Sequence, residues 1–274
     1  MTEKKHHGRQ LTVQIRTKAS PEQVWQAWTD PEKLAQWFVD KARGKPEVGT
    51  TFTWIFEKFN YEIPYEVVVA EPGKRFALGG EVPGRRPFLL EVTIAKDGGE
   101  SVVTLVNSGF LDGKEWDEEY EGIVSGWWNA LGVLKHYLEN YFGQPKSTLL
   151  VLQPAVYEYD LLLPYYATGE GLRSWLASSA SIGAPGEPCA LVLEGGGSVT
   201  GRVLSRTAWE VALSWKELDA VLELKGFRMS PAGRVVGIRV TAWGPGRGEL
   251  PPMEARMQAA LSRLAAILEK GGGR

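Results

Sequence analysis

Cysteine and histidine are scarce in this chain, which limits the chemistry that its side chains can supply. The 274 residues include one cysteine, Cys189, so an intrachain disulfide and a multi-cysteine metal site are both excluded. No histidine in the C-terminal half is present to activate this thiol as a nucleophile, and a buried or incidental cysteine is the favoured interpretation. Of the three histidines, His6 and His7 lie in a polar N-terminal stretch, and we expect His136 on the solvent side of a helix.

Motifs of metal and nucleotide chemistry are missing as well. The sequence has no H-E-x-x-H, no EF-hand pattern and no Gly-rich phosphate loop. Its Gly-rich stretch Leu193–Ser198 contains a single acid, Glu194. We therefore predict no metal ligand, no cofactor and no catalytic residue.

The chain also lacks a charge excess and long apolar runs. A net charge of −2, with no basic excess in either half, argues against a nucleic-acid partner. No apolar run approaches the 18 or so residues of a membrane span, and the polar residues 1–9 lack the apolar centre of a signal peptide. We expect residues 1–9 to be a disordered tail and the protein to be cytoplasmic.

One long amphipathic helix organises the first half of the chain. Trp127, Leu131, Leu134 and Leu138 follow one another at intervals of four, three and four, which predicts a helix from about residue 119 to 142. Gly143 follows as the expected C-cap. Such a helix needs a large concave partner to cover its apolar face.

The residues before this helix predict two short helices and an antiparallel meander. The sequence Ser-Pro-Glu-Gln from Ser20 indicates a capping box, and Asp30-Pro31 indicates a second helix that extends to about Phe38. Alternating runs separated by Gly and Pro predict strands at 11–18, 51–56, 65–70, 75–78, 88–95 and 102–107. An antiparallel sheet curled around the long helix satisfies the burial needs of both.

These residues resemble a known family. Ser20–Phe38, the Asn107-Ser108-Gly109-Phe110 tetrapeptide and the Gly126-Trp127 helix ending in LKHYLE are similar to the START-like (SRPBCC, helix-grip) superfamily. More narrowly, residues 10–143 resemble bacterial relatives of the C-terminal domain of the activator of heat-shock protein 90 ATPase. The resemblance implies a helix-grip fold that hosts lipid carriers, cyclases and co-chaperones. At Asn107 the family commonly has histidine, so a role for an imidazole there is not carried over.

The second half reads as a divergent copy of the first. Glu32-x-Leu34-x-x-Trp37 recurs at Glu170-x-Leu172-x-x-Trp175, and the leucine ladder of the long helix recurs at Leu261–Glu269. Between these matches lie strand-like runs at 189–194, 199–204, 209–215, 220–225 and 235–243. We place the first strand of the copy at Tyr157–Leu163, one short helix near 170–178, and the linker at Gly143–Ser147. The predicted fold class is therefore α+β, with two tandem helix-grip domains at 10–143 and 148–274.

Aromatic side chains carry the functional prediction. The chain has 11 tryptophans, and six large aromatics lie on the strands and helix that a helix-grip fold turns toward each other. Plain core packing and the lining of a cavity are both open interpretations. In the second case a small hydrophobic molecule is the ligand, and Asn107, Arg75 or Glu91 orient it. The cavity candidates are Trp54, Phe56, Tyr65, Phe76, Phe88, Asn107, Trp127 and Leu131.

Two other functions are weighed beside ligand binding. The resemblance implies a contact with a heat-shock chaperone, and the acidic stretch Asp112–Glu121 either serves a basic partner or complements the dipole at the start of the long helix. A cyclase or hydrolase is the least favoured, since histidine is scarce. The alanine-rich final helix predicts a tightly packed second domain that acts as a scaffold or as the surface of a homodimer.

Overall fold

The computed structural model describes residues 9–80, 87–229 and 233–271, and it divides into two compact units, Met1–Gly143 and Gln144–Arg274. Residues 1–8 of the predicted tail, with His6 and His7, lie outside the described residues. Arg9, which was also assigned to the tail, begins the first strand of the sheet.

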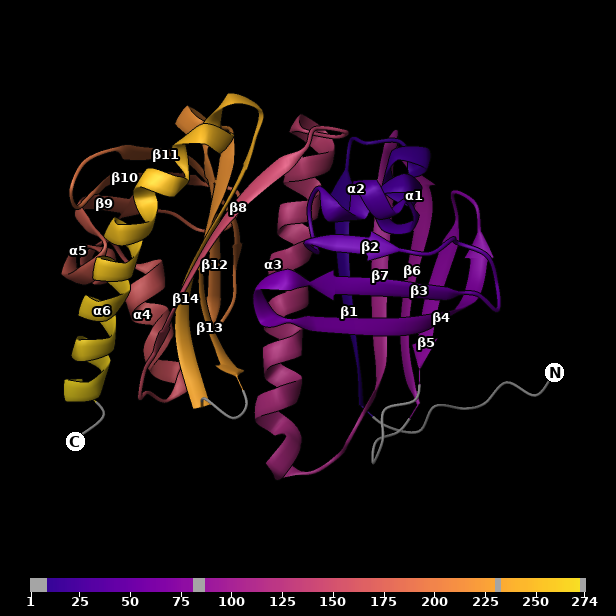
Figure 1. The fold of residues 1–274 in the computed structure, drawn as a ribbon, viewed down its shortest axis with the longest axis horizontal. Helices are drawn as coiled ribbons and strands as arrows, with labels where there is room; N and C mark the ends of the chain where they lie inside the picture. The colour runs from indigo at the N-terminus through magenta and orange to yellow at the C-terminus, as the bar shows by residue number, and fades with distance from the viewer. Residues whose placement is uncertain (1–8, 81–86, 230–232, 272–274) are drawn as a thin grey trace. The chain divides into compact units, whose positions relative to one another are not determined.

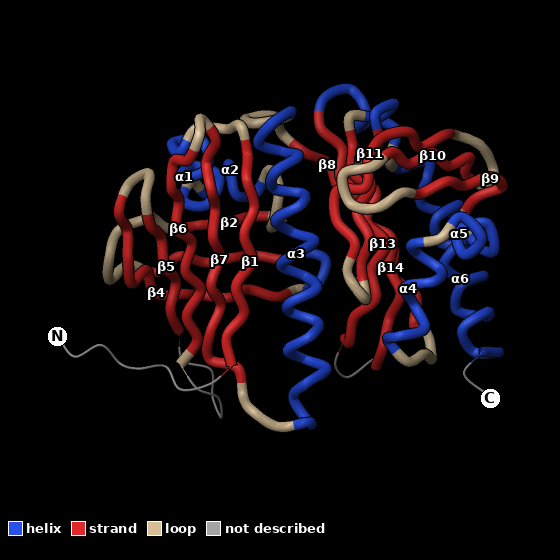
Figure 2. Tube along the Cα trace, turned by 180° about the vertical axis from the view of Figure 1, so that it is seen from behind, coloured by secondary structure: helices blue, strands red, loops and turns tan. Residues whose placement is uncertain are grey.

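Unit 1 contains a seven-stranded antiparallel sheet followed by one long helix (Figures 1 and 2). Its order is β1-β7-β6-β5-β4-β3-β2, so the first strand pairs with the last. The strands are β1 (Arg9–Thr17), β2 (Lys41–Arg43), β3 (Thr51–Phe56), β4 (Tyr61–Glu71), β5 (Arg75–Gly80), β6 (Phe88–Asp97) and β7 (Glu100–Phe110). The helices are α1 (Pro21–Thr29), α2 (Pro31–Ala35) and α3 (Asp117–Asn140).

The helix starts in unit 1 follow the sequence signals. The Ser20 hydroxyl accepts a hydrogen bond from the Gln23 amide, and the Gln23 side chain accepts one from the Ser20 amide, which completes the predicted capping box. Helix α2 is shorter than expected, because the chain turns away at 36–38 with amides bonded to the carbonyls of Lys33 and Leu34. This turn takes Phe38 out of the helix.

The leucine ladder of the long helix α3 packs against the sheet. Leu131, Leu134 and Leu138 are all buried. Three acids, Asp117, Glu118 and Glu119, form its first turn, where negative charge complements the helix dipole. The structural interpretation of the acidic stretch is thereby supported for these three residues.

Unit 2 repeats the same architecture. Its sheet order, β8-β14-β13-β12-β11-β10-β9, is that of unit 1 strand for strand. The strands are β8 (Lys146–Pro154), β9 (Ala177–Ile182), β10 (Pro188–Leu193), β11 (Ser198–Arg206), β12 (Glu210–Trp215), β13 (Ala220–Met229) and β14 (Gly233–Trp243). The helices are α4 (Leu162–Ala167), α5 (Gly169–Trp175) and α6 (Glu254–Gly271). The α+β fold with two tandem helix-grip domains is confirmed.

A hydrogen bond from a buried indole marks the repeat. The Nε1 of Trp37 donates to the carbonyl of Ala27 at 2.8 Å, and the Nε1 of Trp175 donates to that of Tyr165 at 3.1 Å. Both bonds reach back ten residues. The two tryptophans that suggested the repeat in the sequence therefore make the equivalent hydrogen bond in each unit.

Two predictions for the second half are wrong. Its first strand is β8, which begins inside the expected linker, whereas 157–163 forms a loop, a 3-10 turn and the start of α4. Leu149 and Val151 of β8 are buried and pair with Val240 and Ile238 of β14. The second unit also has two short helices, α4 and α5, where one was expected. No helix in the described part of the chain is long and apolar enough to cross a membrane.

Candidate functional site

Aromatic rings of unit 1 gather around Trp127 of α3. The Phe38 ring stacks on Trp127 with centroids 5.4 Å apart, and the rings of Trp28 and Trp54 lie 6.1 and 6.3 Å away. We call the connected set the Trp127 cluster; its members are Trp28, Trp37, Phe38, Trp54, Phe56, Tyr65, Phe88 and Trp127. These rings come from α1, the turn after α2, strands β3, β4 and β6, and α3.

The cluster has a buried centre and a partly open rim. Four of its rings, those of Trp28, Trp37, Trp54 and Trp127, are buried. The other four are only half-buried, and they are Phe38, Phe56, Tyr65 and Phe88. Within the rim, Tyr65 stacks on Phe88 at 5.4 Å and meets Trp54 edge-to-face at 4.9 Å.

Asn107 is the polar residue at the centre of the cluster. It lies on β7 opposite Leu90 of β6, and its side chain is 1% exposed. Its Oδ1 accepts a 3.1 Å hydrogen bond from the Trp127 indole, while its Nδ2 donates to the carbonyl of Leu89 at 3.1 Å. Asn107 therefore holds the Trp127 ring in a fixed orientation.

Two indole N–H groups of the cluster have no acceptor. The Nε1 atoms of Trp28 and Trp54 are buried without a hydrogen-bond partner among the described residues. Leaving a buried donor unpaired costs about 1–3 kcal/mol. Such orphan donors are the kind of group that a bound ligand can satisfy.

The buried polar groups of unit 1 are uncharged. Within its described residues they are threonine, serine and asparagine side chains, with no Asp, Glu, Lys or Arg among them. Burial also raises the pKa of the Tyr65 phenol well above its ordinary value, with a smaller contribution from Tyr61, so this hydroxyl stays protonated. The buried polar side chains in the described part of unit 1 are therefore neutral at physiological pH.

Most of the predicted cavity residues come together, but not all. Trp54, Phe56, Tyr65, Phe88 and Trp127 belong to the cluster, and Asn107 is bonded to it. Phe76 instead forms edge-to-face pairs with Trp25 and Phe52, at 5.9 and 5.8 Å. Leu131 is fully buried one turn along α3, in the leucine ladder.

Arg75 and Glu91 do not orient a ligand in this cluster. They form an ion pair at 2.6 Å. The strand register places their side chains on one face of the sheet and those of Leu90 and Asn107 on the other face. The rings that the sequence did not assign to the site are Trp28, Trp37 and Phe38. The sequence pattern placed Trp28 and Trp37 on the buried sides of two short helices. Phe38 contacts Trp127 because α2 ends before Phe38.

His136 and Cys189 occupy different surroundings from those of a reactive site. His136 was expected in solvent, but it is half-buried, and burial lowers its pKa to about 4 despite the opposing charge of Glu139. The ring is therefore neutral at physiological pH. The Cys189 thiol is buried, and its pKa is raised to about 11 by burial and by Glu217, so it remains protonated.

Unit 2 has no counterpart of the Trp127–Asn107 pair. With the leucine ladders aligned, Met257 takes the place of Trp127. Val240 takes the place of Asn107, three residues before the end of the last strand. Both replacements are buried and apolar. The polar link between helix and sheet is thus a feature of unit 1.

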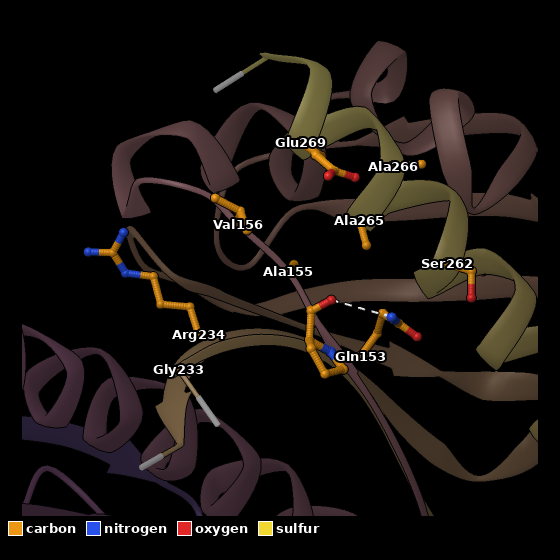
Figure 3. Close-up of a pocket in the computed structure, with 10 residues that line it drawn as sticks. Gln153, Ala155, Val156, Gly233, Arg234, Ser262, Ala265, Ala266 and Glu269 are labelled. Atoms are coloured by element: carbon orange, nitrogen blue, oxygen red, sulfur yellow. Dashed lines mark hydrogen bonds between the residues drawn. The ribbon is translucent and has the colours of Figure 1, made fainter. Parts of the chain in front are cut away.

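Unit 2 carries instead a surface hollow of about 530 Å³, which the sequence analysis did not expect (Figure 3). It is lined by Gln153, Pro154, Ala155, Val156, Gly233, Arg234, Ser262, Ala265, Ala266 and Glu269. No aromatic ring lines it, and Arg234 is already paired with Glu158 at 3.0 Å. Of the five alanines of α6, only Ala260 is buried.

The architecture of each unit, a seven-stranded antiparallel sheet with a long C-terminal helix, is that of a START-like helix-grip domain. Residues 18–139 match the family model described as Activator of Hsp90 ATPase homolog 1-like protein. Unit 1 is therefore a START-like domain related to that family. The match covers less than half of the chain and does not extend to unit 2.

Solved structures resemble the chain at low identity. A protein from Mesorhizobium loti is 22% identical with a TM-score of 0.43, over 47% of this chain and 96% of that one. The Aha1 dimer from Colwellia psychrerythraea is 22% identical with a TM-score of 0.43, over 49% and 99%. DynU16, from the dynemicin biosynthetic locus, is 18% identical with a TM-score of 0.42, over 94% and 98%. A comparison with curated proteins found no match.

Proposed function

We propose that unit 1 binds a small hydrophobic molecule at the Trp127 cluster. The observation that carries the proposal is the graded cluster itself, in which four half-buried rings surround four buried ones. The four rim rings remain partly exposed and offer contact surface to an apolar molecule. Aromatic faces with a few fixed polar groups are the usual lining of sites for apolar ligands.

The rim offers enough apolar surface for measurable affinity. A ligand of two or three fused rings that removes roughly 200 Å² of apolar surface from water gains about 5 kcal/mol. Ring stacking adds about 0.5–1.5 kcal/mol for each well-placed pair. After an entropy cost of association of about 4 kcal/mol, the remaining few kcal/mol correspond to a Kd in the millimolar range.

Binding without catalysis is the preferred form of this function. The described part of unit 1 buries no acidic or basic side chain beside the cluster, and Glu91 lies on the other face of the sheet. Beside the cluster, the described residues of unit 1 therefore assemble no buried acid–base pair that would support a cyclase or hydrolase. Cyclase-like or hydrolase-like chemistry is therefore the weaker alternative.

The test compares ligand binding by three tyrosine or phenylalanine variants. Screening by thermal shift and native mass spectrometry against lipids and aromatic metabolites first identifies a ligand. Tyr65→Leu and Phe88→Leu each remove a rim ring and should weaken binding at least fivefold. Tyr120→Leu is the matched control, because Tyr120 is half-buried and contacts Phe110 rather than the cluster. A panel without any hit, or equal losses in all three variants, would refute the proposal.

A co-chaperone-like contact is the second candidate. The match of residues 18–139 to the Hsp90 ATPase activator family is the observation that favours it. A pull-down with the cognate chaperone and an assay of its ATPase rate would test it. Self-association, which the sequence left open, is tested by light scattering coupled to size-exclusion chromatography.

A further inference from the structure

The unpaired indole of Trp54 lies directly behind the rim of the Trp127 cluster. Its ring meets Tyr65 at 4.9 Å and Phe38 at 5.1 Å, and both of these rings are half-buried. Trp54 itself is 3% exposed, and its Nε1 has no acceptor among the described residues. Trp54 is thus a buried ring in direct contact with two rim rings.

Trp28, the other orphan donor, lies deeper. Its ring contacts are to Trp37 and Trp127, which are both buried, and Trp28 is 1% exposed. The Asn107 amide nitrogen already donates to the carbonyls of Leu89 and Ser108, so it offers no further N–H to a ligand, and its Oδ1 accepts from Trp127. Among the described residues, Trp54 Nε1 is therefore the buried, unpaired donor of the cluster that lies next to the rim, where the Tyr65 hydroxyl is a second polar group.

The charge of the surroundings restricts the ligand further. An ion that enters a site without a buried countercharge loses its hydration and gains no partner, which costs several kcal/mol. An aromatic cage can hold an ammonium ion through cation–π contacts, but no buried carboxylate of the described unit 1 supports one here. A neutral molecule loses no ionic hydration and needs no countercharge.

We propose that the Trp127 cluster selects an uncharged, flat ligand whose oxygen accepts a hydrogen bond from Trp54 Nε1. This inference rests on the proposed ligand-binding function and specifies its chemical class. Aromatic ketones, quinones and related carbonyl compounds satisfy it. Hydrocarbons of the same shape leave the indole donor unpaired, and charged analogues are rejected by the lack of a countercharge.

The test uses four probes of one shape on the full chain. Fluorenone carries the acceptor, fluorene lacks it, and fluorene-9-carboxylate and protonated 9-aminofluorene carry a charge. Calorimetric titration should give fluorenone a Kd about twofold to tenfold below that of fluorene, the range of one neutral hydrogen bond. The two charged probes should bind at least tenfold more weakly than fluorene.

Two variants assign the preference to one indole. Trp54→Phe should abolish the difference between fluorenone and fluorene, and Trp28→Phe should preserve it. In the unsubstituted protein, the indole N–H resonance of Trp54 should shift downfield with fluorenone but not with fluorene, which keeps the test independent of how the variants fold. Equal affinities for ketone and hydrocarbon would overturn this inference and leave the proposed function intact. If neither probe binds, this inference is contradicted, and the screen against lipids and aromatic metabolites decides the proposed function.

Discussion

The indole Nε1 of Trp127 donates a 3.1 Å hydrogen bond to Oδ1 of Asn107, which joins α3 to β7 in the interior of unit 1. The second bond of Asn107, to the Leu89 carbonyl, extends this link to β6. In unit 2 the equivalent positions are Met257 and Val240, which pack without any polar partner. A polar pair that packing alone does not require is thus one difference between the two copies of the fold.

Replacing Asn107 tests the stabilising part of this link. Asn107→Leu removes the acceptor of Trp127 and the donor to Leu89, and leaves both of those groups unpaired in the interior. Unit 1 should lose about 1–3 kcal/mol of unfolding free energy in urea titrations. Gln14→Ala, which removes an exposed hydrogen bond to Thr104, should cost less than about 0.5 kcal/mol. Similar costs for the two variants would contradict the link.

The repeated indole bonds predict equal effects in the two units. Trp37→Phe and Trp175→Phe keep most of the buried ring but leave the carbonyls of Ala27 and Tyr165 without their side-chain donor. Each variant should destabilise its own unit by about 1–3 kcal/mol, through the lost bond and the smaller ring. Amide hydrogen exchange locates the loss. A change that appears in the unsubstituted unit would disprove the equivalence.

Buried ion pairs in unit 2 predict a loss of stability in acid. Glu223 is 1% exposed; burial opposes its ionisation, but Arg239 and Lys225 outweigh burial and hold its pKa at about 2. The folded pKa is thus below the ordinary 4.5, so the stabilisation is complete above pH 4.5 and is lost as the pH falls toward 2. The difference amounts to up to about 3 kcal/mol.

Denaturant titrations between pH 6 and pH 2 measure this effect. Glu223→Gln should be less stable at neutral pH, because Arg239 loses its partner, and its stability should fall less between pH 4.5 and 2 than that of the unsubstituted protein. Glu62→Gln is the control, since its ion pair with Arg43 is exposed. If Glu223→Gln follows the same acid curve as the unsubstituted chain, Glu223 is not the residue responsible.

Local signals predicted much of the fold. The Ser20–Gln23 capping box, the Asp30 cap and the leucine ladders of α3 and α6 depend on near neighbours along the chain, and all of them are present. Strand β8 escaped prediction because 149–152 is a continuous apolar run, which gives no alternation to recognise. The short edge strands β2 and β9 were also missed, since three to six mostly polar or small residues carry little signal.

The candidate site was harder to predict because it depends on register and on one helix end. Phe76 and Trp54 read alike in sequence, yet only Trp54 reaches the Trp127 cluster. Arg75 and Glu91 were proposed for the interior, but a strand register places their side chains on the other face. Phe38 entered the cluster because α2 ends at Ala35, three residues earlier than its pattern indicates.

The tryptophan indole resonances provide the most direct test of ligand binding by unit 1. Their ¹H–¹⁵N signals, assigned by single substitutions, are followed while fluorenone or a ligand from the screen is added to the full chain. The account predicts that the signals of Trp54 and Trp127 move, while those of Trp175 and Trp215 in unit 2 stay in place. Signals that move only in unit 2, or that do not move in either unit, would contradict it.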